Sequence, residues 1–248
     1  MESFQGIHPI PIVHGMTLGE YARMVNQEGW LKNGIKCNLE VIKCENYQHA
    51  MRWKDTQRKW FPPSPNLKTP EAAEWYPVLC WYEGTNVSVG RGTDTPFQLV
   101  GFPYHRALRK IYIQDSLEGT QSHITILGYP FLVKKFIPQS DSIRAKNPMY
   151  KNQPCYGLFL DTIPQNSDTL FLIGLELLQN FYHEYKEYQK FYPQIKEPFF
   201  KSYFYELVGN KTLRTQIENK VSSQEIMESW QKPINEFMQI RKKYLLYK

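Results

Sequence analysis

The sequence predicts a mixed α/β protein with a central mixed sheet, flanking helices and a helical C-terminal third. Three observations carry this prediction: a capped helix near the N-terminus, short β-type apolar runs in the middle, and helical periodicity after residue 167. The 248 residues, of which 42% are hydrophobic, are enough to bury one sizeable core. Because no repeat or linker divides the chain, we expect a single domain over residues 1–248.

The first predicted helix begins after Thr17. Thr17 and Glu20 have the spacing of a capping box, in which each side chain binds the other residue's backbone N–H. Leu18 and Tyr21 fall on one face of that helix. Residues 37–42 approach an alternating, β-branched pattern and are predicted to form a strand. A helix followed by a strand favours α/β layering.

A proline-rich loop and a second helix follow. Residues 62–65 contain three prolines, which fix an extended loop that ends at Asn66. Thr69 has the residue type of an N-cap, and Pro70 suits the first helical position. We therefore predict a short helix that ends near Trp75.

Strands are predicted in the middle of the chain. Residues 78–82 form a compact apolar run of the type found in buried strands, and residues 97–102 resemble a second strand. Residues 104–135 mix basic, polar and β-forming segments. We expect a hairpin-like excursion there.

The C-terminal third is predicted to be helical. Residues 168–191 carry an apolar stripe at helical spacing, and a short helix over 199–207 is expected to end at Gly209. Ser222 and Glu225 repeat the capping-box spacing at the start of a further helix that runs towards residue 241. The stripe consists of Leu170, Ile173, Leu177 and Phe181.

Charge and hydropathy exclude several protein classes. The chain has 30 Lys and Arg against 24 Asp and Glu, a net charge of +6 that favours acidic partners only weakly. Charges of both signs alternate in residues 182–186, which indicates a solvated helix face rather than a nucleic-acid surface. No segment approaches the roughly 20 apolar residues that a membrane span requires.

The four cysteines indicate neither a metal centre nor a disulfide scaffold. They are widely separated, and none forms the closely spaced pair that zinc sites use. We expect them to be small buried side chains on strands. The sequence indicates no metal or organic cofactor. The cysteines are Cys37, Cys44, Cys80 and Cys155.

The stretch from residue 83 to residue 93 is the strongest candidate for chemistry. It follows a predicted strand and contains three glycines, which permit positive φ angles and close approach to a ligand. Glu83 follows two bulky aromatic residues, so its carboxyl group is expected to be partly desolvated, as suits a proton donor. Arg91 offers a planar guanidinium for a carboxylate or phosphate.

Other interpretations of these residues stay open. The stretch lacks the spacing of a phosphate-binding loop and of a dinucleotide fingerprint, and it could be a glycine-rich turn whose polar residues bind their own backbone. His14, just before the first helix, could contact a ligand or be a structural histidine. Asn66 could contact a ligand or simply form a turn.

Four segments together resemble a known family. They are PIPIVHGMTLGE at residues 9–20, PPSPNL at 62–67, CWYEGTNVSVGRGT at 80–93, and SWQ with RKKYLLY near the C-terminus. These segments resemble the NamZ-type exo-β-N-acetylmuramidases, which are bacterial glycoside hydrolases. The resemblance runs from about residue 7 to the C-terminus.

The resemblance implies removal of terminal N-acetylmuramic acid from the non-reducing end of peptidoglycan fragments. It implies an acid/base or sugar-binding role for Glu83, with Arg91 holding the lactyl carboxylate of muramic acid. The substrate contacts implied are Arg91, Asn86 and Ser88, with His14 and Asn66 at the rim. The expected partners are muropeptides or disaccharides, and no nucleic acid.

The resemblance also implies a Rossmann-like N-terminal domain, and we expect this chain to correspond only to the C-terminal part of the family. Three hypotheses follow: a hydrolase working alone or with a separately encoded N-terminal half, a non-catalytic muropeptide-binding or interaction module, and an unrelated basic binding module. Residues 1–6 contain no signal peptide, which predicts a cytoplasmic location for the chain as written. A fragment of an exported protein would instead be periplasmic or extracellular.

Overall fold

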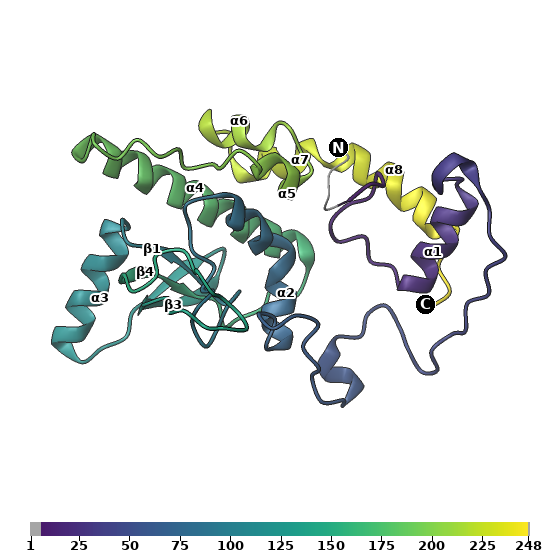
Figure 1. The fold of residues 1–248 in the computed structure, drawn as a ribbon, viewed down its shortest axis with the longest axis horizontal. Coiled ribbons are helices and arrows are strands. Elements are labelled where there is room, and N and C mark those ends of the chain that lie inside the picture. The colour runs from purple at the N-terminus through teal and green to yellow at the C-terminus, as the bar shows by residue number, and fades with distance from the viewer. Residues whose placement is uncertain (1–5, 248) are drawn as a thin grey trace.

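A computed structural model describes residues 6–247. The prediction that a signal peptide is absent concerns residues 1–6, of which residues 1–5 lie outside the described residues. Figure 1 shows a sheet at one end of the molecule and a pair of helices at the other end, joined by a long helical layer. Among the described residues, no helix combines the length and the apolar character that crossing a membrane requires.

The sheet has four strands: β1 (Leu99–Phe102), β2 (His123–Ile126), β3 (Tyr129–Phe136) and β4 (Cys155–Phe159). Their order is β1-β4-β3-β2, and every neighbouring pair is antiparallel. The mixed α/β class is confirmed, but the sheet is antiparallel throughout rather than mixed. The predicted strand over residues 97–102 is confirmed as β1.

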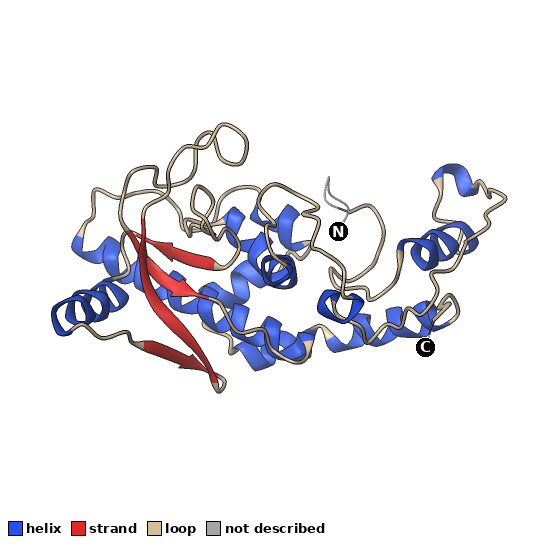
Figure 2. Cartoon of the chain, turned by 90° about the horizontal axis from the view of Figure 1, so that it is seen from below, coloured by secondary structure: helices blue, strands red, loops and turns tan. Residues whose placement is uncertain are grey.

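Helices cover the sheet (Figure 2). They are α2 (Pro70–Leu79), α3 (Arg106–Glu118) and α4 (Ser167–Phe191), the last matching the predicted long helix. Trp75 of α2 packs edge-on against Phe131 of β3, with ring centroids 5.9 Å apart. Phe102 of β1 packs in the same way against Phe181 of α4, at 5.3 Å. These fully buried aromatic rings join the sheet and the helices into one core.

The predicted strand over residues 78–82 is wrong. Thr69 and Pro70 begin a helix as predicted, but α2 continues past Trp75 to Leu79 and then tightens into the 3₁₀ helix η3 (Cys80–Gly84). Val78 and Leu79 are buried, as expected. A short apolar run is equally compatible with a buried strand and a buried helix, so burial was predictable and the backbone conformation was not.

The predicted strand over residues 37–42 is also wrong. This segment is extended but pairs with no strand of the sheet, and Ile42 is exposed. It lies in the long connection that contains η1 (Lys32–Gly34) and η2 (Trp53–Thr56). An alternating pattern forms a strand only where a partner strand is available, and the sheet lies at the other end of the molecule (Figure 1).

Residues 104–135 contain more than the predicted hairpin. Helix α3 precedes the hairpin of β2 and β3. The prediction that the cysteines are buried on strands holds for Cys155 on β4. Cys80 is half-buried in η3, whereas Cys37 and Cys44 are exposed.

The C-terminal helices are α5 (Phe204–Val208), α6 (Leu213–Glu218), α7 (Ser223–Ser229) and α8 (Gln231–Lys242). Gly209 ends α5 with a φ of 67°, and the Ser222 capping box begins α7, both as predicted. The single helix predicted from residue 222 is interrupted at Trp230. Pro233 explains the interruption, because proline has no N–H to donate to the carbonyl of Ser229 and its ring clashes with that carbonyl.

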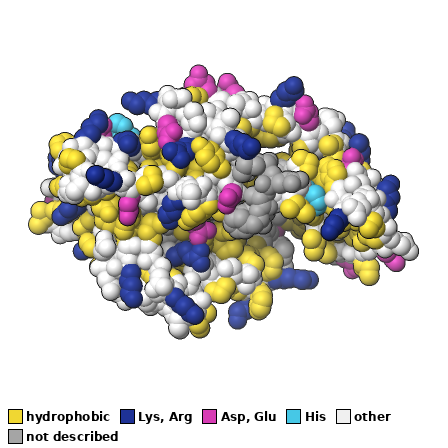
Figure 3. Space-filling model, turned by 45° about the horizontal axis from the view of Figure 1, so that its top comes forward, with side chains coloured by type: hydrophobic (Ala, Val, Ile, Leu, Met, Phe, Trp, Pro, Cys, Tyr) yellow, Lys and Arg dark blue, Asp and Glu magenta, His cyan; other side chains and the backbone are white. Residues whose placement is uncertain are grey.

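Helix α1 (Leu18–Gln27) begins with the predicted capping box and packs beside α8 (Figure 1). Met24, Phe237 and Tyr244 form a second, small core between the two ends of the chain. Basic side chains on the face in Figure 3 are dispersed among acidic and hydrophobic ones.

Candidate functional site

The stretch after η3 is held between the sheet and the segment that precedes α5. Ser88 forms a bridge with Gly101 of β1, through backbone hydrogen bonds of 2.9 and 3.0 Å. On its other side, Thr85 bridges Phe200, and the N–H of Asn86 donates to the carbonyl of Phe199 at 3.0 Å. Backbone bonds on both sides therefore fix residues 85–88.

Two glycines then reverse the chain. Gly90 and Gly92 have φ angles of 73° and 87°, which glycine adopts readily. At Gly92 a Cβ atom would lie 2.6 Å from the carbonyl oxygen of Gln139, so a side chain there is excluded. The reversal brings Arg91 back to Glu83: Arg91 Nη1 donates to Glu83 Oε1 at 2.5 Å. The two side chains are 43% and 25% exposed, respectively.

Glu83 and Arg91 line a pocket of about 620 Å³. It is lined by the stretch that begins at Glu83, which we call its floor, and by side chains from residues 144–150 and 197–203, which we call its walls. The structure thus brings together four of the predicted site residues: Glu83, Asn86, Ser88 and Arg91. The two interpretations of residues 83–93 are therefore compatible: the stretch forms a glycine-rich turn, and this turn also lines a pocket.

Asn86 and Ser88 are buried and shape this pocket through hydrogen bonds to the protein. Asn86 Nδ2 donates to the carbonyl of Pro198 at 2.9 Å, and the Tyr150 hydroxyl donates to the carbonyl of Asn86 at 2.7 Å. Burial raises the pKa of Tyr150, so its hydroxyl keeps its proton at neutral pH. The Ser88 hydroxyl accepts a bond from the Gly90 N–H at 3.2 Å.

Asn66 lies behind a wall of the pocket rather than at its rim. It is 6% exposed, and its Nδ2 donates to the carbonyl of Arg144 at 2.9 Å. Its Oδ1 is buried without a hydrogen-bond partner among the described residues. The prediction that Asn66 lies at the rim is therefore corrected. Asn66 does not line the pocket, and it contacts the backbone of Arg144, which does.

His14 does not reach the pocket. Its ring stacks on Tyr21 of α1 at 5.5 Å, and its carbonyl accepts a bond from Arg241 Nε at 3.0 Å. Burial, together with the positive charge of Arg241, lowers the pKa of His14. These contacts belong to the small core between α1 and α8, at the end of the molecule away from the sheet (Figure 1). They favour a structural histidine over a ligand contact.

The pocket has an excess of positive charge. Its charged lining residues are Arg91, Arg144, Lys146 and Lys201 against Glu83 and Glu197. Arg144 forms an ion pair with Asp141, whose pKa is held well below its usual range chiefly by the hydrogen bond from the Arg144 side chain. A pocket of this kind suits a polar ligand that carries a negative charge.

Sequence reasoning missed Glu197 and Lys201. Both lie far from Glu83 in the chain, and no local motif marks them. They reach the pocket because residues 198–201 pair with the stretch from residue 84 to residue 86. Only this long-range pairing could have identified them.

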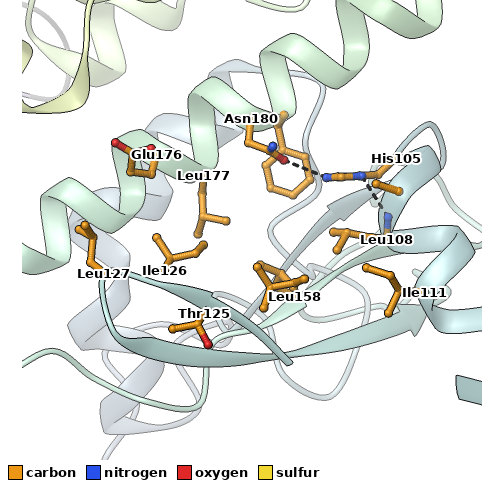
Figure 4. Close-up of a pocket in the computed structure, with 13 residues that line it drawn as sticks. His105, Leu108, Ile111, Thr125, Ile126, Leu127, Leu158, Glu176, Leu177 and Asn180 are labelled. Carbon is orange, nitrogen blue, oxygen red and sulfur yellow. Dashed lines mark hydrogen bonds between the residues drawn. The ribbon is translucent and has the colours of Figure 1, made fainter. Parts of the chain in front are cut away.

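A second cavity, of about 430 Å³, lies between α3, β2 and α4 (Figure 4). Its walls are mostly apolar, and His105 at one end binds Asn180 Oδ1 through Nε2 at 3.0 Å. Burial lowers the pKa of His105. None of the predicted site residues lines this cavity. Within residues 6–247, no three His, Cys, Asp or Glu side chains are grouped so that they could hold a metal ion.

Two family models match the chain. The model described as "Exo-beta-N-acetylmuramidase NamZ, C-terminal" matches residues 74–247, and the corresponding N-terminal model matches residues 1–71. The chain is 33% identical over 245 residues to the peptidoglycan beta-N-acetylmuramidase NamZ of Bacillus subtilis (strain 168). That alignment covers 99% of this chain and 53% of the relative, so the chain spans about half of the relative's length.

Two crystal structures of DUF1343 family proteins from Bacteroides fragilis NCTC 9343 have a similar fold. One superposes with a TM-score of 0.75 at 36% identity and covers 100% of this chain and 60% of its own. The other has a TM-score of 0.74 at 24% identity and covers 96% of this chain and 58% of its own. The second likeness concerns the fold alone.

The family matches correct one expectation. We predicted a resemblance to the C-terminal part of the family only, but residues 1–71 match the N-terminal model. A separately encoded N-terminal partner is therefore not supported. The C-terminal match covers most of the chain and includes Glu83 and Arg91. The chain belongs to the NamZ exo-β-N-acetylmuramidase family.

Proposed function

We propose that this chain acts on peptidoglycan fragments and releases terminal N-acetylmuramic acid from the non-reducing end. The observation that carries the proposal is the ion pair of Glu83 and Arg91 in the pocket of about 620 Å³. The relative from Bacillus subtilis, which is named for this activity, supports the choice of reaction and substrate.

Hydrolysis of a glycosidic bond generally uses two carboxyl groups, one as acid and one as base or nucleophile. Glu83 and Glu197 are the two acidic residues that line the pocket. In this proposal Glu83 is the acid/base group, and Glu197 supplies the second carboxylate. Arg91 holds the carboxyl group of Glu83 in place through their hydrogen bond. Asn86 and Ser88 shape the floor on which the sugar rests.

The second candidate function is a non-catalytic module that binds muropeptides. The excess of positive charge favours it as much as it favours hydrolysis, because both need the pocket to accept an anionic sugar. The two functions differ in whether the glycosidic bond is cleaved.

The experiment that separates them uses the purified chain with a β-linked disaccharide that has N-acetylmuramic acid at its non-reducing end. Release of free N-acetylmuramic acid, detected by mass spectrometry, is the expected result. The matched control is a disaccharide with N-acetylglucosamine at that end, which should stay intact. Binding without release would favour the non-catalytic module, and neither binding nor release would overturn the proposal.

A further inference from the structure

We infer that Lys201 is a specificity-determining residue of this pocket and binds the carboxylate of an acidic sugar beside Glu83. The inference rests on the proposed function for the identity of the sugar. It assigns to Lys201 the role that the sequence suggested for Arg91.

Two of the four cations already have carboxylate partners. Arg91 is paired with Glu83, and Arg144 is paired with Asp141. An incoming anion would gain less from these two guanidinium groups, because the positive charge of each is already offset by a neighbouring carboxylate. Lys146 and Lys201 form no ion pair among the described residues. They are therefore the two lining cations whose positive charge is not offset by an ion pair among the described residues.

Of these two lysines, Lys201 is the one that is held in place. Its Nζ donates to the backbone carbonyl of Glu83 at 3.2 Å and lies 5.8 Å from the ring centroid of Tyr203. Lys146 is exposed, and its ammonium group forms no hydrogen bond within residues 6–247. Binding an anion costs less side-chain entropy at a cation that is already ordered.

The backbone around Lys201 is fixed as well. Its N–H donates to the carbonyl of Gly84 at 2.9 Å, and the Tyr203 hydroxyl donates to the carbonyl of Glu83 at 3.1 Å. An ammonium group has three N–H donors, so the bond to Glu83 leaves two for a ligand. The free donors lie next to the proposed acid/base residue.

This placement fits the chemistry of muramic acid. Its lactyl carboxylate is carried on the sugar ring whose anomeric carbon reacts. A carboxylate bound at Lys201 would therefore keep that ring close to Glu83. N-acetylglucosamine lacks the lactyl group and would leave Lys201 without an anionic partner, so the pocket would discriminate between the two sugars.

The test measures the binding of free N-acetylmuramic acid and free N-acetylglucosamine by titration calorimetry, in the full chain and in three variants. Lys201→Met should weaken binding of N-acetylmuramic acid about tenfold and leave that of N-acetylglucosamine unchanged. Lys201→Arg should keep the preference. Lys196→Met, an exposed lysine outside the pocket, is the matched control and should behave as the unaltered chain.

An equal loss of affinity for both sugars in Lys201→Met, or no loss, would overturn the inference. So would the absence of any preference in the unaltered chain. Cleavage of the disaccharide is measured separately, so failure of the proposed hydrolysis is distinguishable from failure of carboxylate recognition. Thermal unfolding of each variant shows whether a loss of binding reflects misfolding.

Discussion

The side chain of Asn66 donates a hydrogen bond to the backbone carbonyl of Arg144, at 2.9 Å, and so ties the proline-rich loop to a wall of the pocket. Residues 144–150 form that wall. Asn66 is buried, and among residues 6–247 its amide nitrogen forms this one hydrogen bond to the wall. We therefore predict that Asn66, which lies outside the pocket, acts as a positioning residue for this wall.

Replacing Asn66 with Ala should therefore loosen the wall. We expect KM for a chromogenic muramide to rise severalfold with little change in kcat, and the free energy of unfolding to fall by about 1 kcal/mol. Steady-state kinetics and thermal unfolding check both parts. Asn66→Asp, which keeps the size but loses the donor, should have a similar KM. An unchanged KM in both variants would contradict the positioning role.

Arg91 should affect turnover more than substrate binding, because it holds the Glu83 carboxyl group. We expect Arg91→Met to lower kcat about tenfold or more with a smaller change in KM. Arg91→Lys keeps the charge but not the planar fork, so it should recover only part of kcat. The measurement is the split between kcat and KM for the same muramide. A rise in KM alone would instead support the predicted clamp on the lactyl carboxylate.

Glu197 should be needed for cleavage but not for folding. Glu197→Gln is expected to lower kcat about 100-fold, because the pocket then has a single carboxylate. Glu176→Gln, an exposed glutamate that lines the other cavity, is the matched control and should keep full activity. Full activity of Glu197→Gln would remove Glu197 from the reaction.

Acidification should destabilise the contact between the two ends of the chain. Burial and the nearby Arg241 lower the pKa of His14 below its ordinary value of 6.5. The folded state then binds fewer protons than the unfolded state. The stability that neutral His14 contributes is thus complete above about pH 6.5 and is lost as the pH falls through its lowered folded value.

Glu20 acts in the same direction at lower pH. Burial alone would raise its pKa, but hydrogen bonds from Leu246, Thr17 and His49 outweigh this effect and lower it below the ordinary value of 4.5. Its contribution is present above 4.5 and is lost as the pH falls through the lowered folded value. Tm measured from pH 8 to pH 3 should therefore fall in two stages.

His14→Gln should remove the first stage, and Glu20→Gln the second. A Tm that stays constant or rises as the pH falls from 7 to 3 would contradict this assignment.

Local signals in the sequence predicted helix starts and buried positions well. Thr17, Thr69 and Ser222 are the N-caps that the sequence predicted, because a capping bond spans only three residues. Which segments pair as β-strands could not be predicted from such local signals. The segment over residues 37–42 has a strand pattern without a partner strand, and residues 78–82 are apolar enough for either conformation.

The same distinction applies to the site. Glu83 and Arg91 lie eight residues apart in a glycine-rich turn, so their contact follows from local geometry. Glu197 and Lys201 join them through backbone pairing between distant segments, which no motif in the sequence marks. His14 belongs to a segment that resembles the family, and that resemblance implies a position at the rim of the pocket. In the structure, however, His14 contacts α1 and α8 instead.

The initial rate at which Glu83→Gln hydrolyses a chromogenic muramide tests the central claim most directly. The substitution keeps the size of the side chain and removes its ability to transfer a proton. With folding verified by thermal unfolding, we predict a rate at least about 100-fold below that of the unaltered chain. A rate equal to that of the unaltered chain would contradict the assignment of this pocket as the place where the glycosidic bond is cleaved.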